Sequence, residues 1–237
     1  MNAVAATLQN DRLASFLAEP KTCSLAALLK SRLARAPTRI LVVGCGRGKE
    51  AAVLANFFKA DVTGIDLRQD FDPAAASLAQ LQEGDAMNLA FPDRSFDLVY
   101  SFHALEHIAD PQRALKEMRR VLQPRGHYCI GTPNRARWIG YLGSKDATFG
   151  QKIRWNFADW NARLHGRFRN ELGAHAGFYR AELEHRLHES FGTAEDITLE
   201  YYLEQYPGRS GLISSLARLG VAQRLLPCVY FLGMRTT

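Results

Sequence analysis

The stretch RILVVGCGRG, residues 39–48, decides how the rest of the chain is interpreted. Its first half is an apolar run that predicts a buried strand over residues 40–43, and its second half carries glycines at positions 44, 46 and 48. Glycine lets the backbone turn tightly and lets a ligand approach without meeting a side chain. A helical pattern over residues 51–58 follows directly. This order of strand, glycine loop and helix predicts a ligand site at the N-terminus of the helix.

The spacing of the glycines distinguishes between cofactor classes. A dinucleotide fingerprint, G-x-G-x-x-G, needs its third glycine at position 49, where this chain has Lys49; the glycine stands one position earlier. Asp66 comes 22 residues after Gly44, at the end of the run 62–65 that predicts a second strand. A carboxylate at that place can accept hydrogen bonds from both hydroxyls of a ribose. Since a dehydrogenase uses the same carboxylate, Asp66 predicts a ribose but does not choose the cofactor.

Strand and helix patterns alternate after residue 39. A helix is predicted from Pro73, a strand over 96–102, an amphipathic helix ending before Pro124, and a strand over 127–131. Such alternation requires crossover connections, so it predicts an α/β fold with a parallel sheet. Beyond residue 180 the patterns predict a helix over 183–191, extended segments over 197–203 and 228–234, and an apolar helix over 212–226.

Five short motifs downstream carry a family resemblance. They are GDA at 84–86, SFDLVYS at 95–101, HALEHI at 103–108, LQPRG at 122–126 and GTPN at 131–134. In this order, behind the glycine loop, they resemble the small-molecule branch of class I S-adenosylmethionine-dependent methyltransferases, the type 11 and ubiquinone-biosynthesis-like enzymes. The resemblance implies a Rossmann-like, doubly wound, mostly parallel seven-stranded sheet with helices on both faces and its last strand antiparallel. It also implies S-adenosylmethionine as cofactor and S-adenosylhomocysteine as product.

The resemblance also assigns cofactor-binding residues. Asp85 receives the adenine amino group in such enzymes, and the main-chain N–H of Ala86 meets the ring. The full expected set is Gly44, Cys45, Gly46, Gly48, Asp66, Leu67, Asp85, Ala86, Ser101 and His103. One position departs from the family, because Val42 stands where an acidic residue often helps to hold the methionine ammonium. The resemblance therefore leaves that group without its usual partner.

Two histidines are candidate general bases for an oxygen acceptor. His107 ends the sequence HALEH, and His175 lies just before Gly177, where relatives often bring a histidine near the acceptor. HALEH also fits the H-x-x-E-H spacing of some zinc peptidases, but its place directly after a predicted strand argues against a peptidase. A divalent ion that assists O-methylation is an alternative. The prediction is a site without a metal.

The regular alternation stops between residues 135 and 178. All three tryptophans, at 138, 155 and 160, lie in this interruption, where related enzymes build a lid over the acceptor. We expect Trp155, Phe157 and Trp160 to form an apolar wall. Arginines at 163, 167 and 169 are expected to contact an anionic group. The domain prediction is an N-terminal helical cap over 1–37 and a methyltransferase domain over 38–237 with this lid inserted at about 135–178.

Composition and charge bear on the redox state of the cysteines, on the partners and on the location of the protein. The four cysteines lie far apart and form no C-x-x-C pair, so we expect them to be reduced and structural. Residues 119–186 hold thirteen Lys or Arg against five acids, a net +8 within a chain of net charge +6. With no signal sequence and no apolar span of about 20 residues, the expected location is cytoplasmic, and peripheral membrane contact stays open. We expect a monomer or homodimer.

These observations predict a methyltransferase that acts on an oxygen of a small acceptor, a phenol, quinone-like, sugar or lipid-linked compound with a negative charge. An RNA or other nucleic-acid methyltransferase is an alternative that would use the basic window, although residues 101–104 read SFHA instead of the D/N-P-P-Y/F motif of amino-directed DNA enzymes. Nucleic acid is thus the less favoured partner. A non-catalytic module that binds S-adenosylmethionine is the second alternative.

Overall fold

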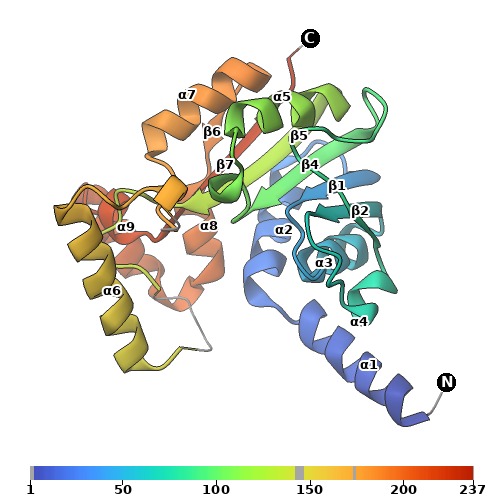
Figure 1. The fold of residues 1–237 in the computed structure, drawn as a ribbon, viewed down its shortest axis with the longest axis horizontal. Helices are drawn as coiled ribbons and strands as arrows, with labels where there is room; N and C mark the ends of the chain where they lie inside the picture. Colours follow the sequence, from blue (N-terminus) through green and yellow to red (C-terminus); the bar gives the residue numbers. More distant parts are fainter. Residues whose placement is uncertain (1–2, 142–146, 173–174, 237) are drawn as a thin grey trace.

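A seven-stranded sheet forms the centre of the molecule in the computed structural model, which describes residues 3–141, 147–172 and 175–236 (Figure 1). The strand order is β3-β2-β1-β4-β5-β7-β6, and β7 runs antiparallel to its two neighbours while the other strands are parallel to one another. The strands are β1 (Arg39–Val43), β2 (Asp61–Asp66), β3 (Gln80–Glu83), β4 (Phe96–Phe102), β5 (Leu122–Pro133), β6 (Glu195–Asp196) and β7 (Cys228–Met234). The predicted doubly wound, mostly parallel sheet is confirmed.

Helices cover both faces of this sheet. They are α1 (Ala3–Leu17), α2 (Pro20–Arg32), α3 (Lys49–Phe58), α4 (Pro73–Ala76), α5 (Pro111–Val121), α6 (Phe149–Leu164), α7 (Arg180–Phe191), α8 (Thr198–Gln205), α9 (Ser210–Arg218) and α10 (Ala222–Leu225), with short 3-10 helices η1 (Leu105–His107), η2 (Asn170–Leu172) and η3 (Pro207–Arg209). None of the helices in the described part of the chain has the length and apolar character needed to cross a membrane.

The alternation of side chains along β1 divides the interior into two cores. Ile40 and Val42 point to one face, where α2, α3 and α8 pack, and Leu41 and Val43 point to the other, where α5 and α7 pack. Strands that are buried on both faces become continuous apolar runs, which is why β1 was recognisable from the sequence. The two helix layers hold the ends of the central strands in place.

The carboxyl ends of β1, β2 and β4 meet at one edge of the sheet. Val43 pairs with Ile65 on one side and with Ser101 on the other, so the loops that follow these strands leave the sheet side by side. The chain reverses its direction of winding at β1, since β2 lies on one side and β4 on the other. Open α/β sheets bind ligands at such a switch point.

Two expectations for the C-terminal part were wrong. The segment predicted to be extended over 197–203 is the helix α8, because Ile197 and Tyr201, one turn apart, both pack into the core beside β7. Asp196 also accepts the N–H of Thr198 at 2.7 Å, which supports the first turn. The apolar helix predicted over 212–226 is broken into α9 and α10 at Gly220, whose φ is +72°.

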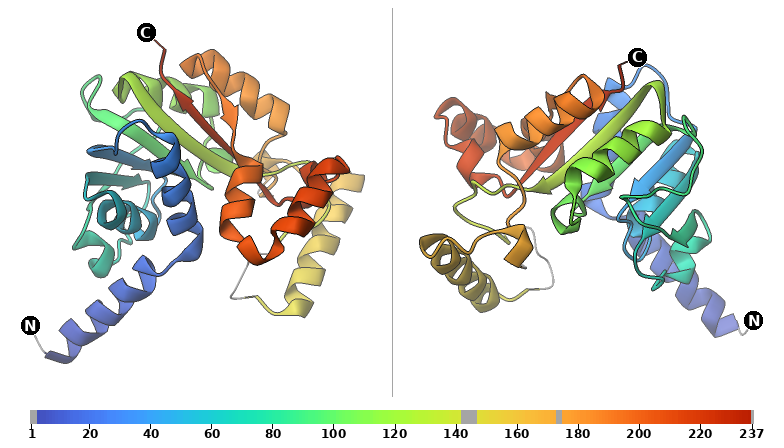
Figure 2. Two further views of the ribbon diagram at one scale, coloured as in Figure 1. Left: turned by 180° about the vertical axis from the view of Figure 1, so that it is seen from behind. Right: turned by 45° about the horizontal axis from the view of Figure 1, so that its top comes forward.

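The segment between β5 and α7 leaves the sheet and returns to it. The N–H of Arg135 donates to Phe178 O at 3.0 Å, and the N–H of Phe178 donates to Pro133 O at 3.1 Å, so the two ends of the excursion are joined. Between them lies α6, at one end of the molecule (Figure 2). Residues 142–146 and 173–174 of the predicted lid lie outside the described residues.

Candidate active site

The glycine loop turns sharply because its backbone is left-handed at Gly44, Gly46 and Gly48. A Cβ on Gly44 would lie 2.1 Å from the Cβ of Ala104, so the loop after β4 can approach only a glycine there. A Cβ on Gly46 would meet nothing within 4 Å. The outer side of the loop is therefore open to a ligand, while its inner side is closely packed.

Asp66 holds the loop and faces the same edge. Its Oδ2 accepts the N–H of Gly46 at 2.8 Å, and its Oδ1 accepts the N–H of Arg68 at 3.2 Å. Each carboxylate oxygen has two acceptor positions, so one position on each oxygen remains for a ribose hydroxyl. The residue predicted to bind a ribose thus also fixes the glycine loop that lies beside it.

The residues expected around an adenine lie at the end of β3 and β2. Asp85 Oδ1 accepts the N–H of Met87 at 2.8 Å, which orients the carboxylate, and Ala86 is buried directly behind it. Leu67 is 70% exposed, although leucine usually packs inside. An exposed apolar side chain directly after Asp66 fits one face of a purine ring.

Two other expected cofactor residues have structural roles in their side chains. Ser101 is buried and its hydroxyl donates to Val43 O at 3.1 Å, which joins β4 to β1. Burial raises the pKa of the Cys45 thiol to about 12, and the nearby Asp66 carboxylate acts in the same direction. Cys45 is therefore a neutral thiol. Contacts of Ser101 and Cys45 with a cofactor stay a prediction that rests on their main chains.

The first turn of α3 offers main-chain N–H groups and one carboxylate. Its N-cap residue is Gly48, which provides no side-chain cap, so the N–H groups of the first turn remain for an anion such as a carboxylate. Glu50 lies in the same turn. Burial raises the pKa of Glu50 to about 7, although the charge of His103 opposes this rise. Glu50 is not among the residues predicted from the sequence, because only the fold brings it near His103, the residue after β4.

His103 follows β4 in a left-handed conformation with φ +52°, which is uncommon for a residue other than glycine. Its Nδ1 lies 3.2 Å from Glu106 Oε1, and its Nε2 lies 3.5 Å from Cys228 Sγ. Burial opposes protonation of His103, but the contacts with Cys228 and Glu106 outweigh it and raise the pKa of the imidazole to about 10. His103 therefore keeps its proton near neutral pH.

The two histidines predicted as bases lie together. The rings of His107, in η1, and His175, in the segment before Phe178, are 4.8 Å apart between centroids and nearly perpendicular. Desolvation lowers the pKa of His175, and the neighbouring His107 lowers it further. His175 is therefore neutral near pH 7 and can accept a proton. The 68 positions that separate the two residues made this contact invisible in the sequence.

Glu106 lies beneath this pair. Its side chain is fully buried, Oε1 is 4.0 Å from His107 Nε2, and Oε2 has no hydrogen-bond partner among the described residues. One ligand atom from each of Glu106, His107 and His175 could be chosen within 4.8 Å of the others, which is a spacing that could hold a metal ion. The expectation of a site without a metal stays a prediction.

A cavity of about 720 Å³ opens between the end of α6 and the start of α7. Its lining contains Arg135, Arg163 and Arg169, with Phe168, Tyr179 and one acidic residue, Glu171. The guanidinium carbon of Arg163 stacks 3.8 Å above the Phe168 ring. Two of the three arginines expected to contact an anion, Arg163 and Arg169, thus line one cavity; Arg167 is not part of the lining as described.

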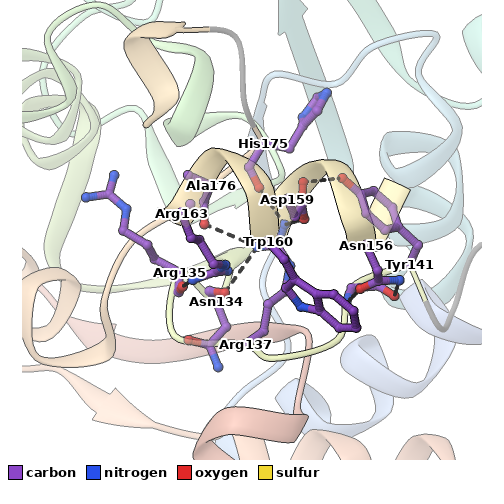
Figure 3. A network of polar contacts seen from close by, with 12 residues as sticks. Asn134, Arg135, Arg137, Tyr141, Asn156, Asp159, Trp160, Arg163, His175 and Ala176 are labelled. Carbon is purple, nitrogen blue, oxygen red and sulfur yellow. Dashed lines mark hydrogen bonds and ion pairs between the residues drawn. The ribbon is translucent and has the colours of Figure 1, made fainter. Parts of the chain in front are cut away.

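A polar network holds α6 beside this cavity (Figure 3). Buried Arg137 pairs with Asp159 at 3.2 Å and donates to the carbonyl oxygens of Asn134, His175 and Ala176. The main chain of His175 is therefore fixed by Arg137. Trp155 packs against Tyr141, on the other side of α6 from the contacting pair Phe157 and Trp160, so the three aromatic side chains do not form one wall.

Comparisons with known proteins agree with this geometry. Residues 41–130, from β1 through most of β5, match the model of the methyltransferase domain family. Residues 41–130 therefore form a methyltransferase domain of the class I S-adenosylmethionine-dependent type. The glycine loop, Asp66 and Asp85 lie inside the matched region, whereas His175 and the arginine-lined cavity lie outside it.

Curated relatives match less than half of the chain. An O-methyltransferase, cnsE, of Penicillium expansum is 36% identical over 118 residues, 42% of this chain and 43% of that protein. The 27-O-demethylrifamycin SV methyltransferase of Amycolatopsis mediterranei is 33% identical over 106 residues, 41% of this chain and 39% of that protein. The chain thus spans about two fifths of the length of these relatives.

A solved structure matches nearly the whole chain. The plantazolicin methyltransferase BpumL aligns with a TM-score of 0.63 over 98% of this chain and 89% of that one, at 15% identity. At such identity the likeness shows the fold alone. The open side of Gly46 and the free acceptor positions of Asp66 fit S-adenosylmethionine, the cofactor of the methyltransferase domain.

Proposed function

We propose that this protein is an O-methyltransferase that acts on a small acceptor carrying a negative charge. Bound S-adenosylmethionine would supply an electrophilic methyl group on its sulfonium sulfur. A neutral hydroxyl is a poor nucleophile and needs a base, whereas a neutral amine does not. The observation that carries the proposal is the contact between His107 and His175 beside buried Glu106, because it offers a base where the acceptor is expected.

In this proposal His175 accepts the proton of the acceptor hydroxyl. Its lowered pKa keeps it neutral near pH 7, and Arg137 fixes its main chain through the 2.9 Å bond to His175 O. The ring of His107 lies against that of His175, and Glu106 Oε1 in turn lies 4.0 Å from His107 Nε2. The protein otherwise aligns the acceptor and excludes water.

The cofactor would be held by three groups of residues. Asp66 binds the ribose hydroxyls, Asp85 and Ala86 receive the adenine, and the first turn of α3 binds the methionine carboxylate. Glu50 supplies the negative charge that the position of Val42 lacks. Support for this role comes from the location of Glu50 in that turn and from its electrostatic contact with His103, the residue after β4.

The negative charge of the acceptor is proposed from the cavity near α7. Three arginines and a single acidic residue line this cavity. One guanidinium group can donate two parallel hydrogen bonds to the oxygens of a carboxylate or phosphate. The carbonyl oxygen of Arg135 also accepts from Arg163 at 2.7 Å, which places two of the guanidinium-bearing residues next to each other. The relatives include O-methyltransferases such as cnsE, beside N- and C-methyltransferases, so an oxygen acceptor is proposed from the two histidines.

Labelled S-adenosylmethionine tests this proposal. The protein is incubated with the methyl-labelled cofactor and a cell extract, and the small-molecule, lipid, RNA and protein fractions are separated. We expect the label in an anionic small molecule or lipid, with the methyl group attached to oxygen as an ester, which base cleaves, or as an ether. We expect the His175→Gln variant to produce no such labelled product. Label in RNA would support the nucleic-acid alternative. Cofactor binding without any labelled product would support a non-catalytic module.

A further inference from the structure

Helix α6 exposes its apolar side and turns polar residues toward the protein. Five large apolar residues are exposed, from 41% for Ile153 and Trp160 to 61% for Phe157, 79% for Phe149 and 85% for Leu164. Their spacing of four, four, three and four positions places all five on one side of the helix. We call this side the α6 apolar face. A surface helix of a soluble domain normally buries such a face.

The side of α6 that adjoins the apolar face is anchored to the protein by polar contacts. Asn156, the buried residue of the helix, bonds to both the N–H and the carbonyl oxygen of Gly140 at 2.7 and 3.2 Å. Asp159 binds Arg137 and Tyr141, and Arg163 donates to Arg135 O at 2.7 Å (Figure 3). These contacts hold the helix with its apolar face outward.

The segment that carries the α6 apolar face has an excess of positive charge. In the described residues from 135 to 169 there are seven Lys or Arg and one acid, Asp159, which Arg137 neutralises. Arg154, Arg167 and Arg169 are exposed. An apolar helix face flanked by basic residues matches the interface of an anionic lipid bilayer, where apolar side chains enter the boundary of the acyl chains and cations meet the headgroups.

We propose that the α6 apolar face docks the protein onto an anionic membrane surface. Two other occupants fit less well. A second copy on the same face would bring its basic residues against those of the first and repel it. A nucleic acid would favour the arginines but gain little from aliphatic Ile153 and Leu164, because bases stack on planar side chains. The position of α6 at one end of the molecule leaves it free to meet a surface (Figure 2).

Vesicle binding tests this proposal without any methyl transfer. Vesicles of phosphatidylcholine alone are compared with vesicles doped with phosphatidylglycerol, by co-sedimentation. All three tryptophans of the chain lie between positions 138 and 160, so a blue shift of their fluorescence reports insertion without a label. We expect binding to the anionic vesicles only, weakened by salt because exposed charges are screened.

A triple variant, Phe149→Ser, Phe157→Ser and Leu164→Ser, removes the most exposed apolar side chains while keeping Trp160 as the reporter. We expect it to bind anionic vesicles about tenfold more weakly or worse. Leu199→Ser, at an exposed leucine of α8, is the matched control and is expected to bind like the unmodified protein. Full binding by the triple variant would overturn the proposal. The proposal would also be overturned if the unmodified protein bound neither kind of vesicle. The same holds if the unmodified protein formed a dimer or an RNA complex that the triple variant could not form.

Discussion

Replacing Asp66 with asparagine probes the cofactor site most sharply. The carboxylate accepts the N–H groups of Gly46 and Arg68, one on each oxygen, and keeps one acceptor position on each oxygen for a ribose hydroxyl. The amide of asparagine is neutral and has a single acceptor oxygen, so at least one ribose O–H loses its charged acceptor. A hydrogen bond to a charged group contributes about 1.5–3 kcal/mol. Since about 1.4 kcal/mol corresponds to tenfold in affinity, S-adenosylhomocysteine should bind roughly 10- to 150-fold more weakly.

The assay is calorimetric titration of the purified variant with S-adenosylhomocysteine. Asp61→Asn is the matched control, because Asp61 is the first residue of the same strand, β2, and lies at the amino end of the strand, away from the cofactor site. This control is expected to bind like the unmodified protein, and thermal unfolding of both variants checks that β2 is intact. Equal affinity of Asp66→Asn and the unmodified protein would refute the placement of the ribose.

Three other perturbations address the base, the ammonium site and the metal question. Burial and His107 lower the pKa of His175, so the acidic limb of the kcat/KM profile should have its midpoint below 6.5, the usual pKa of histidine. The His175→Gln variant should lose that limb and should have a kcat reduced about 100-fold or more. A midpoint above 6.5 would contradict the assignment of His175 as the base. Glu50 ionises as the pH rises through its pKa of about 7, so S-adenosylmethionine should bind more tightly above pH 7 than below it. If the Glu50→Gln variant keeps this pH dependence, Glu50 does not hold the methionine ammonium. Methyl transfer should persist after dialysis against EDTA, and loss that Mg²⁺ or Zn²⁺ restores would make Glu106, His107 and His175 a metal centre.

Much of the sheet could be predicted because its central strands are buried on both faces. β1 and β4 are nearly continuous apolar runs, and the glycine loop marks the end of β1. The edge strands left no such pattern: β3 consists of Gln80, Leu81, Gln82 and Glu83, three of them exposed, and β6 has two residues. The segment that forms α8 was predicted to be a strand because β-branched and aromatic residues, as at 197–203, are common in strands. Packing of this segment against β7 favours the helix instead.

The candidate site was predictable where a single segment builds it. Gly44 and Asp85 follow a strand, Asp66 ends one, and the three keep fixed distances along the chain, so pattern alone locates them. Contacts between distant segments were not predictable in this way. The contact of Cys228 with His103 spans 125 positions, and the orientation of α6 depends on buried Arg137 and Asp159, whose pairing no local pattern indicates.

A crystal structure with S-adenosylhomocysteine tests the central claim most directly. The claim is that the cofactor lies across the carboxyl ends of β1, β2 and β4 with its sulfur facing the two histidines. We predict the ribose on Asp66, the adenine beside Asp85 and Ala86, and the ring of His107 or His175 within about 6 Å of the sulfur, the reach of a base through an acceptor oxygen. A ligand elsewhere, or a sulfur that faces neither histidine, would contradict the claim.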